Sequence, residues 1–97
     1  MEKNMLLQKS FDILLVDDTP EHIDVAVQVL KNSNFKIRVA TDGNTALKLI
    51  YQQKPDLILL DIYMPQMDGF ELCRLIKNTP DLKSIPIIFL TAYSDEE

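Results

Sequence analysis

Several residue types that would point to particular classes of protein are scarce in this chain. A single cysteine, Cys73, excludes an internal disulfide and is typical of a reducing compartment. No apolar run approaches the ~20 residues that a membrane-spanning helix needs, and residues 1–10 lack the apolar stretch of a signal peptide. Lysine and arginine number 10 against 15 acidic residues and form no cluster, which argues against nucleic-acid binding. We therefore expect a cytoplasmic protein that binds neither membrane nor nucleic acid.

Glycine is also rare, and its placement excludes a further class. A nucleotide-binding α/β fold needs a glycine-rich loop after its first strand. The corresponding stretch here is "DDTPEH", which contains no glycine. The net charge of −5 instead suits a protein that holds cations.

What is present is an alternation of short apolar runs and helical patterns. With 97 residues the chain is one domain at most. Thr19 is a good N-cap and Pro20 suits a first helical position, so a helix is expected to begin there. The order β-α-β-α-β-α-β predicts an α/β fold with a doubly wound parallel sheet. The expected strands are 13–16, 35–40, 56–60 and 86–92, and the other expected helices are 41–53 and 70–78.

Acidic side chains follow two of these strands. The first ends in Asp17 and Asp18, the third in Asp61, and the fourth in Thr91. Ligands of such sheets bind at the carboxyl ends of the strands. If the first and third strands are neighbours, three carboxylates meet there, and at least one pKa rises unless a cation binds. Oxygen ligands of this number suit Mg²⁺, and a carboxylate can itself be a phosphoryl nucleophile. Alternatively, Asp17 or Asp18 only caps the following helix.

Three stretches together resemble one known family. "LLVDD", "DLILLDIYMPQMDGFEL" and "PIIFLTA", in this order and spacing, are similar to the receiver domain of bacterial two-component response regulators over about residues 11–94. The resemblance implies a flavodoxin-like fold whose first four strands lie in the order 2-1-3-4. It further implies that a phosphohistidine on a sensor histidine kinase, or on a histidine phosphotransfer protein, donates a phosphoryl group to this domain.

The resemblance also implies roles for individual residues. Asp61 would be the phosphoacceptor. Asp18 and Asp61 would ligate Mg²⁺ directly, together with the backbone carbonyl of Tyr63, and Asp17 would act through a metal-bound water. Thr91 would bind the phosphoryl oxygen and act as a switch, and the small Ala92 would leave room for the group. Pro65 and Gly69 would shape the loop after Asp61.

The resemblance departs from the family pattern at the carboxyl end. A complete receiver has one more helix, a fifth strand with a lysine that pairs with the phosphoryl group, and a final helix, which would all lie beyond Glu97. We therefore expect a polar segment over 1–10 and, over 11–97, a receiver domain that lacks this last strand and its flanking helices. Strand four then becomes an exposed apolar edge, which predicts self-association.

Three other readings compete with the phosphoacceptor. A receiver that acts only by dimerising or binding a protein has no need of three acids and a threonine. An aspartate-nucleophile phosphatase resembles a pattern with a second acid two residues after the nucleophile, where Tyr63 stands. His22, the only histidine, is expected to be a solvated helix residue rather than a phosphotransfer group. We therefore expect a signalling domain and not an enzyme.

Overall fold

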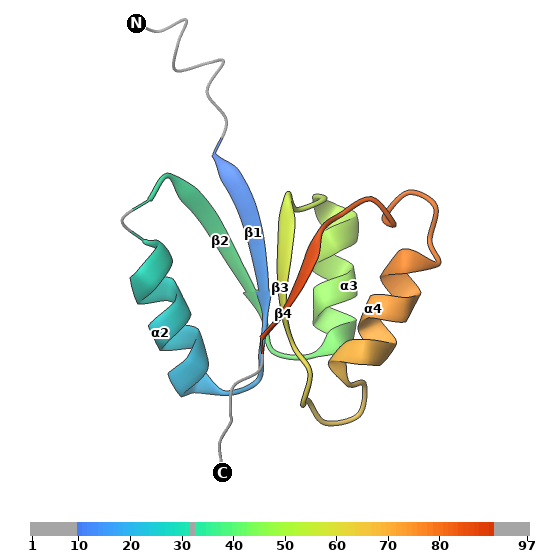
Figure 1. The fold of residues 1–97 in the computed structure, drawn as a ribbon, viewed down its shortest axis with the longest axis horizontal. Helices are drawn as coiled ribbons and strands as arrows, with labels where there is room; N and C mark the ends of the chain where they lie inside the picture. Colours follow the sequence, from blue (N-terminus) through green and yellow to red (C-terminus); the bar gives the residue numbers. More distant parts are fainter. Residues whose placement is uncertain (1–9, 32, 91–97) are drawn as a thin grey trace, which may run out of the picture.

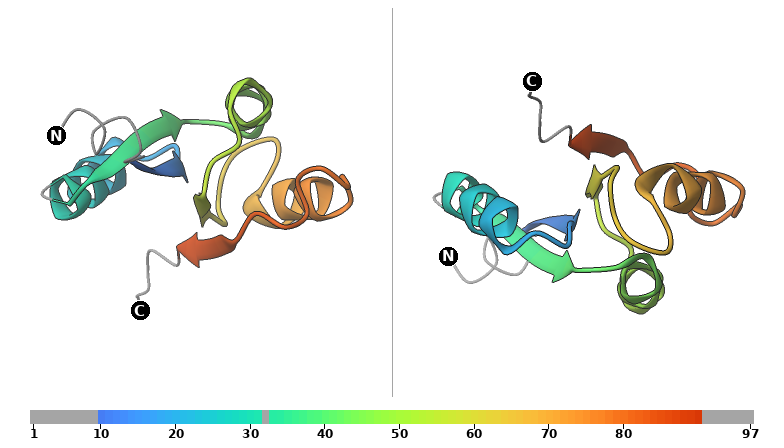
Figure 2. Two further views of the ribbon diagram at one scale, coloured as in Figure 1. Left: turned by 90° about the horizontal axis from the view of Figure 1, so that it is seen from above. Right: turned by 90° about the horizontal axis from the view of Figure 1, so that it is seen from below.

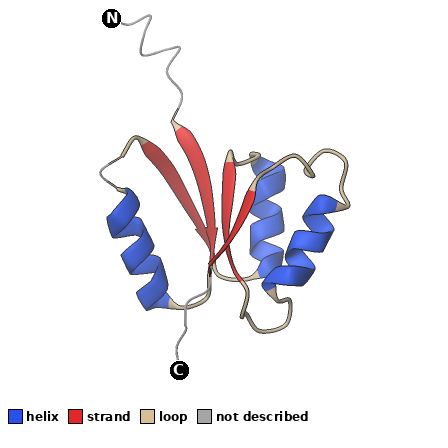
Figure 3. Ribbon diagram, viewed as in Figure 1, coloured by secondary structure: helices blue, strands red, loops and turns tan. Residues whose placement is uncertain are grey.

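The computed structural model describes residues 10–31 and 33–90 of the chain. Strands and helices alternate along them, as Figures 1 and 3 show. Their bounds are β1 (Phe11–Val16), α2 (Pro20–Leu30), β2 (Phe35–Ala40), α3 (Gly43–Gln52), β3 (Leu57–Asp61), α4 (Gly69–Lys77) and β4 (Ile87–Leu90). The predicted order of elements is confirmed. None of the helices in these residues is long and apolar enough to cross a membrane.

The four strands form one parallel sheet in the order β2-β1-β3-β4, which confirms the predicted topology. β1 lies between β2 and β3, with Val16 opposite both Ala40 and Leu60. Parallel pairing places all carboxyl ends at one edge of the sheet, the lower edge in Figure 1. The loops from β1 to α2 and from β3 to α4 leave from that edge.

The two faces of the sheet are covered unequally. The end views in Figure 2 show α3 and α4 on one face and α2 alone on the other. Strand residues on the first face pack with α3 and α4 into the main core, which includes Leu14, Val16, Ala46, Ile50, Ile58, Leu60, Leu72 and Ile76. No residue of α2 is fully buried. The described part of the chain therefore derives most of its hydrophobic stabilisation from one face.

Both helices on the covered face begin with an aspartate followed by glycine. The side chain of Asp42 accepts a hydrogen bond from the Thr45 N–H, and that of Asp68 accepts one from the Glu71 N–H. At α4 the Glu71 side chain also accepts from the Asp68 N–H, which completes a capping box. The capping box fixes where α4 begins, and so fixes the end of the loop that follows β3.

A buried ion pair lies at the opposite, amino edge of the sheet. The side chain of Asp12 is 2% exposed, and its Oδ1 accepts from Arg38 Nε at 3.1 Å. The same guanidinium donates to the carbonyl oxygens of Leu49 at 3.0 Å and Gln53 at 2.8 Å. Among the described residues, Asp12 Oδ2 has no hydrogen-bond partner. Arg38 therefore joins β1 and β2 to the carboxyl end of α3.

Candidate functional site: an acidic cluster at the carboxyl edge

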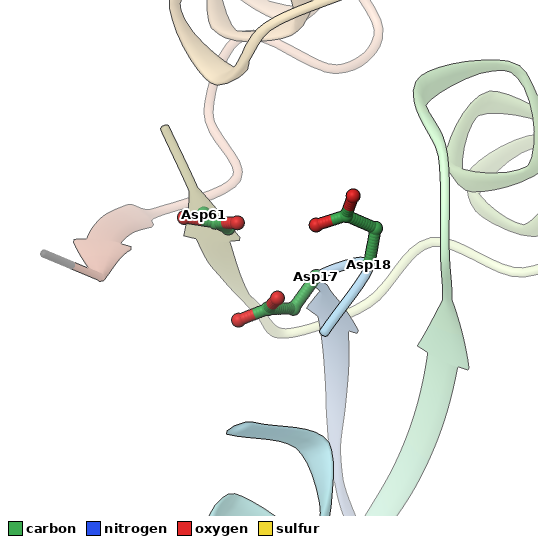
Figure 4. Close-up of side chains that lie close together, drawn as sticks. All are labelled: Asp17, Asp18 and Asp61. Carbon is green, nitrogen blue, oxygen red and sulfur yellow. The ribbon is translucent and has the colours of Figure 1, made fainter. Parts of the chain in front are cut away.

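The structure brings together three of the predicted site residues. Asp17 and Asp18 follow β1, and Asp61 is the last residue of the neighbouring β3. One carboxylate oxygen from each lies within 4.8 Å of the others, and Figure 4 shows the three carboxylates around one common space. Asp17 is 1% exposed and Asp61 3% exposed. Two of the three acids are thus almost fully buried, while Asp18 is half-buried at the same site.

Asp17 is held by two donors from the segment that follows it. Its Oδ1 accepts from the backbone N–H of Thr19 at 2.9 Å, and its Oδ2 lies 3.2 Å from Nδ1 of His22. Asp18 Oδ1 accepts more weakly from the Thr19 hydroxyl at 3.5 Å. Asp17 therefore holds the turn into α2 while it also belongs to the cluster. Thr19 is the N-cap of α2, as predicted, but no side chain of the described residues makes a cap hydrogen bond there, so neither Asp17 nor Asp18 caps the helix.

His22 differs from its predicted surroundings. The sequence predicts a solvated helix residue, and the side chain is indeed 40% exposed. Its ring nitrogen nevertheless contacts the buried carboxylate of Asp17. The sequence made no prediction of this contact, because helical periodicity describes which face of α2 is solvated, and not which side chain reaches back from the first turn toward the preceding strand.

The carboxyl group of Asp61 has a raised pKa. Burial raises its pKa above the ordinary value of 3.8, and the neighbouring charges of Asp17 and Asp18 raise it further. The backbone N–H of Tyr63 donates to Asp61 Oδ1 at 3.3 Å and opposes this rise. Within residues 10–31 and 33–90, no lysine or arginine forms an ion pair with the cluster. The site is therefore short of positive charge, which is the condition for cation binding.

The loop between β3 and α4 returns tightly to the end of β3. A Cβ built on Gly69 would lie 2.4 Å from the carbonyl oxygen of Asp61 and 2.9 Å from Cα of Ile62. The N–H of Gly69 donates to the Ile62 carbonyl at 2.9 Å. Gln66 takes a positive φ of 70°, next to a turn in which the Met67 N–H donates to the carbonyl of Pro65 at 2.8 Å. Gly69 thus has no room for a side chain, and the loop-shaping role of Pro65 stays a prediction.

The structure describes only some of the remaining predicted site residues. Thr91 and Ala92 lie outside the described residues. The Tyr63 ring is exposed, while its backbone N–H faces Asp61. The ligand role of its carbonyl stays a prediction. The described site therefore consists of the three acids, Tyr63 and the tight loop that ends at Gly69.

The raised pKa of Asp61 predicts a pH dependence of stability. Because the folded state binds this proton more tightly than the unfolded state, the free energy of unfolding should fall as pH rises through the raised pKa, and stay low above it. Asp61→Asn removes the buried charge and keeps the acceptor for Tyr63. We expect it to stabilise the cation-free protein at about pH 7.5 by on the order of 1–2 kcal/mol.

Urea unfolding with EDTA at about pH 7.5 and at about pH 5 measures this effect. The difference between Asp61→Asn and the unchanged chain should shrink at the lower pH. A variant that is less stable than the unchanged chain at the higher pH would contradict the electrostatic account. Asp81→Asn is the matched control, since Asp81 is exposed and lies in the turn before β4.

The fold and the cluster together define a class of protein: a flavodoxin-like α/β domain with an acidic, cation-compatible site at the carboxyl edge of its parallel sheet. The family that shares these features matches residues 13–97 and is described as the response regulator receiver domain. The chain belongs to this family, whose members are signalling domains of two-component systems.

Individual relatives support the same assignment. The chain is 44% identical over 85 residues to a protein of Vibrio cholerae named "Probable cyclic di-GMP phosphodiesterase". The matched region covers 88% of this chain and 19% of that protein. The chain is 38% identical to the N-terminal domain of a response regulator receiver protein from Methanoculleus marisnigri, with a TM-score of 0.83 and coverage of 91% and 72%. It is 37% identical to the Mn²⁺-bound form of response regulator Rcp1, with a TM-score of 0.77 and coverage of 88% and 68%. The chain thus spans about a fifth of the length of the Vibrio relative.

Proposed function

We propose that this domain is a phosphoacceptor whose nucleophile is Asp61. The observation that carries the proposal is the position of Asp61, at the end of β3, with an oxygen within 4.8 Å of both other acids and its backbone fixed by the Gly69 turn. A rigid strand end holds the carboxylate in one place, and positioning contributes much of the rate of a phosphoryl transfer. The phosphodiesterase name of the Vibrio protein describes that longer protein, and we propose no such activity for this chain.

The donor set fits a hard divalent cation. Three carboxylates without a lysine or arginine partner in the described segments supply the oxygen ligands and the negative charge that Mg²⁺ prefers. Asp18, Asp61 and the carbonyl of Tyr63 would hold it, and Asp17 would hold one of its waters. When bound, Mg²⁺ would neutralise the charge that develops on the transferred group. The Mn²⁺-bound Rcp1 structure shows a related domain with a divalent cation.

The proposed reaction transfers one phosphoryl group. A carboxylate oxygen of Asp61 attacks the phosphorus of a phosphohistidine, a P–O bond forms, and the P–N bond breaks with its electron pair returning to the imidazole, which then takes up a proton. The donor would be a sensor histidine kinase or a histidine phosphotransfer protein. Thr91 and Ala92 are proposed to receive the phosphoryl oxygens. The domain would act as a signalling module and not as an enzyme on other substrates.

Incubation with acetyl phosphate and Mg²⁺, followed by intact-protein mass spectrometry, tests the proposal. We expect the mass of one phosphoryl group to be gained by the unchanged chain and by the control variant Asp81→Asn. The gain should be abolished by Asp61→Asn and by EDTA, because one removes the nucleophile and the other the cation. Peptide mapping should place the group on Asp61.

Two outcomes would contradict the proposal. A phosphoryl group that persists in Asp61→Asn would mean that another residue is the acceptor. A folded chain that binds Mg²⁺ but gains no mass would favour the second candidate function, a domain that acts by protein binding alone. The same proposal includes a receiver domain over 11–97 in a cytoplasmic protein. It also includes the absence of nucleic-acid and membrane partners.

The second candidate function, protein binding alone, is supported by an exposed apolar strand that could mediate self-association. In the described residues β4 is an edge strand, and its side chains alternate: Ile87 and Phe89 pack on the core, while Ile88 is 51% exposed. An apolar edge of this kind pairs readily with another strand. We expect dimers or larger species by light scattering at micromolar concentration. Ile88→Lys should shift them to monomers, whereas Tyr51→Lys, on the exposed surface of α3, should not. A monomeric unchanged chain would refute this prediction.

A further inference from the structure

Outside the proposed ligand set, two side chains of the described residues contact the cluster: the Thr19 hydroxyl lies 3.5 Å from Asp18 Oδ1, and His22 makes the shorter contact, with the more deeply buried Asp17. His22 is in the first turn of α2, and its Nδ1 lies 3.2 Å from Asp17 Oδ2. The partner carboxylate is 1% exposed, so this contact replaces a hydrogen bond that water would otherwise supply. The other oxygen of Asp17 accepts from the backbone of Thr19 at 2.9 Å. Each oxygen of Asp17 therefore has one donor from the turn into α2.

The contact defines the protonation of the ring. An ionised carboxylate has only acceptors, so Nδ1 must carry the hydrogen and donate it to Oδ2. With one donor on each oxygen, the Asp17 carboxylate cannot rotate about its Cβ–Cγ bond without breaking a hydrogen bond. Each oxygen keeps a second lone pair that is not used by the turn. Asp17 is therefore oriented before any cation arrives.

We propose that His22 is a positioning residue for the cation site, which holds Asp17 in the orientation that receives a cation-bound water. The inference rests on the proposed function, because it needs the cluster to bind a divalent cation. Without the Nδ1 donor, only the Thr19 N–H still restrains the Asp17 carboxylate, and Oδ2 can turn away from the two neighbouring charges at the cost of that single hydrogen bond. That rotation must then be reversed when the cation binds, which weakens binding. Partners of metal ligands commonly affect affinity in this way.

Three substitutions separate the hydrogen bond from the bulk of the ring. His22→Asn places an amide N–H where Nδ1 lies, because both nitrogens are bonded to Cγ. His22→Gln places its amide nitrogen one bond further out, near the position of Nε2. His22→Ala removes every donor. Only the asparagine variant should therefore keep the contact with Asp17.

The experiment is a calorimetric titration of the metal-free chain with Mg²⁺ alone, at about pH 8, where an ordinary imidazole is neutral. We expect His22→Ala and His22→Gln to weaken Mg²⁺ binding by about threefold to tenfold. His22→Asn should stay within about twofold of the unchanged chain. Urea unfolding with EDTA provides the second readout. It should differ little among the three variants, because the side chain is 40% exposed.

The outcomes distinguish this inference from the proposed function. If the unchanged chain binds no Mg²⁺, the proposed function fails. If it binds Mg²⁺ and His22→Ala binds equally well or more tightly, the role of His22 is refuted and the cation site stands. If asparagine does not rescue, or if affinity follows the loss of folding stability in all three variants, His22 has only a structural role and the inference is again overturned.

Discussion

Replacing Arg38 with methionine is expected to lower the free energy of unfolding by about 3–5 kcal/mol, because it leaves the Asp12 carboxylate charged and buried without its partner. The Asp12 side chain is 2% exposed, and the 3.1 Å contact with Arg38 Nε is its only ion pair in the described segments. The substitution also removes the donors to the carbonyls of Leu49 and Gln53 at the end of α3. A small domain has about 5–15 kcal/mol of stability in total, so the variant should be close to unfolding.

Two controls make this prediction specific. Lys36→Met changes a second cation on β2, whose Nζ donates only to the exposed Gln53 side chain at 3.2 Å, and should cost less than about 1 kcal/mol. The double variant Asp12→Leu/Arg38→Met should recover most of the loss, since a buried pair is often replaceable by apolar side chains. Urea unfolding measures all three. Equal effects of Arg38→Met and Lys36→Met would show that the buried pair contributes no more than a surface contact.

The Asp12–Arg38 pair also shows why part of the fold could not be predicted. The apolar run begins at Ile13, so Asp12 reads as a polar flank of the strand. Its burial follows from the register, in which Leu14 lies opposite Arg38 and both point to the face covered by α3. A shift of one residue would place Arg38 on the other face. Strand order follows from a family resemblance, but nothing in the local pattern fixes such a register.

The clustering of the three acids could be predicted from the sequence, whereas the contacts of individual side chains around them could not. Asp17, Asp18 and Asp61 are identifiable because each ends or directly follows an apolar strand, and a parallel sheet collects such ends at one edge. The contact of His22 depends on the turn that Asp17 and Thr19 form, which periodicity does not describe. In α4, Leu72 and Ile76 are fully buried, whereas Leu75 is exposed although it lies only one turn or less from both. Cys73 packs against the core instead, because α4 meets the sheet along a stripe shifted toward that residue.

Replacing Gly69 with alanine is expected to cost about 3 kcal/mol and to weaken the cation site together with the fold. The added Cβ would lie 2.4 Å from the Asp61 carbonyl oxygen and 2.9 Å from Cα of Ile62. Both atoms belong to the backbone, so the clash is relieved only if the end of β3 or the start of α4 moves. Overpacking against a rigid neighbour costs about 1–3 kcal/mol, and here there is no flexible side chain to yield. The displaced segment carries Asp61 itself, so Mg²⁺ affinity and phosphorylation should fall as well.

Gly43→Ala is a closely matched control, because Gly43 is also the first residue of a helix and also follows an aspartate N-cap. Its added Cβ would lie 2.6 Å from the sulfur of Met67, the end of a side chain that can change rotamer. We expect the free energy of unfolding, measured in urea, to change by less than about 1 kcal/mol. Alanine reduces the conformational entropy of the unfolded chain, and this gain offsets the cost of moving the Met67 side chain. Equal losses of unfolding free energy in the two variants would mean that any side chain at the first position of these helices is unfavourable. A loss confined to Gly69→Ala, with weaker Mg²⁺ binding in calorimetry, would show that the close return of the loop to Asp61 is what requires glycine there.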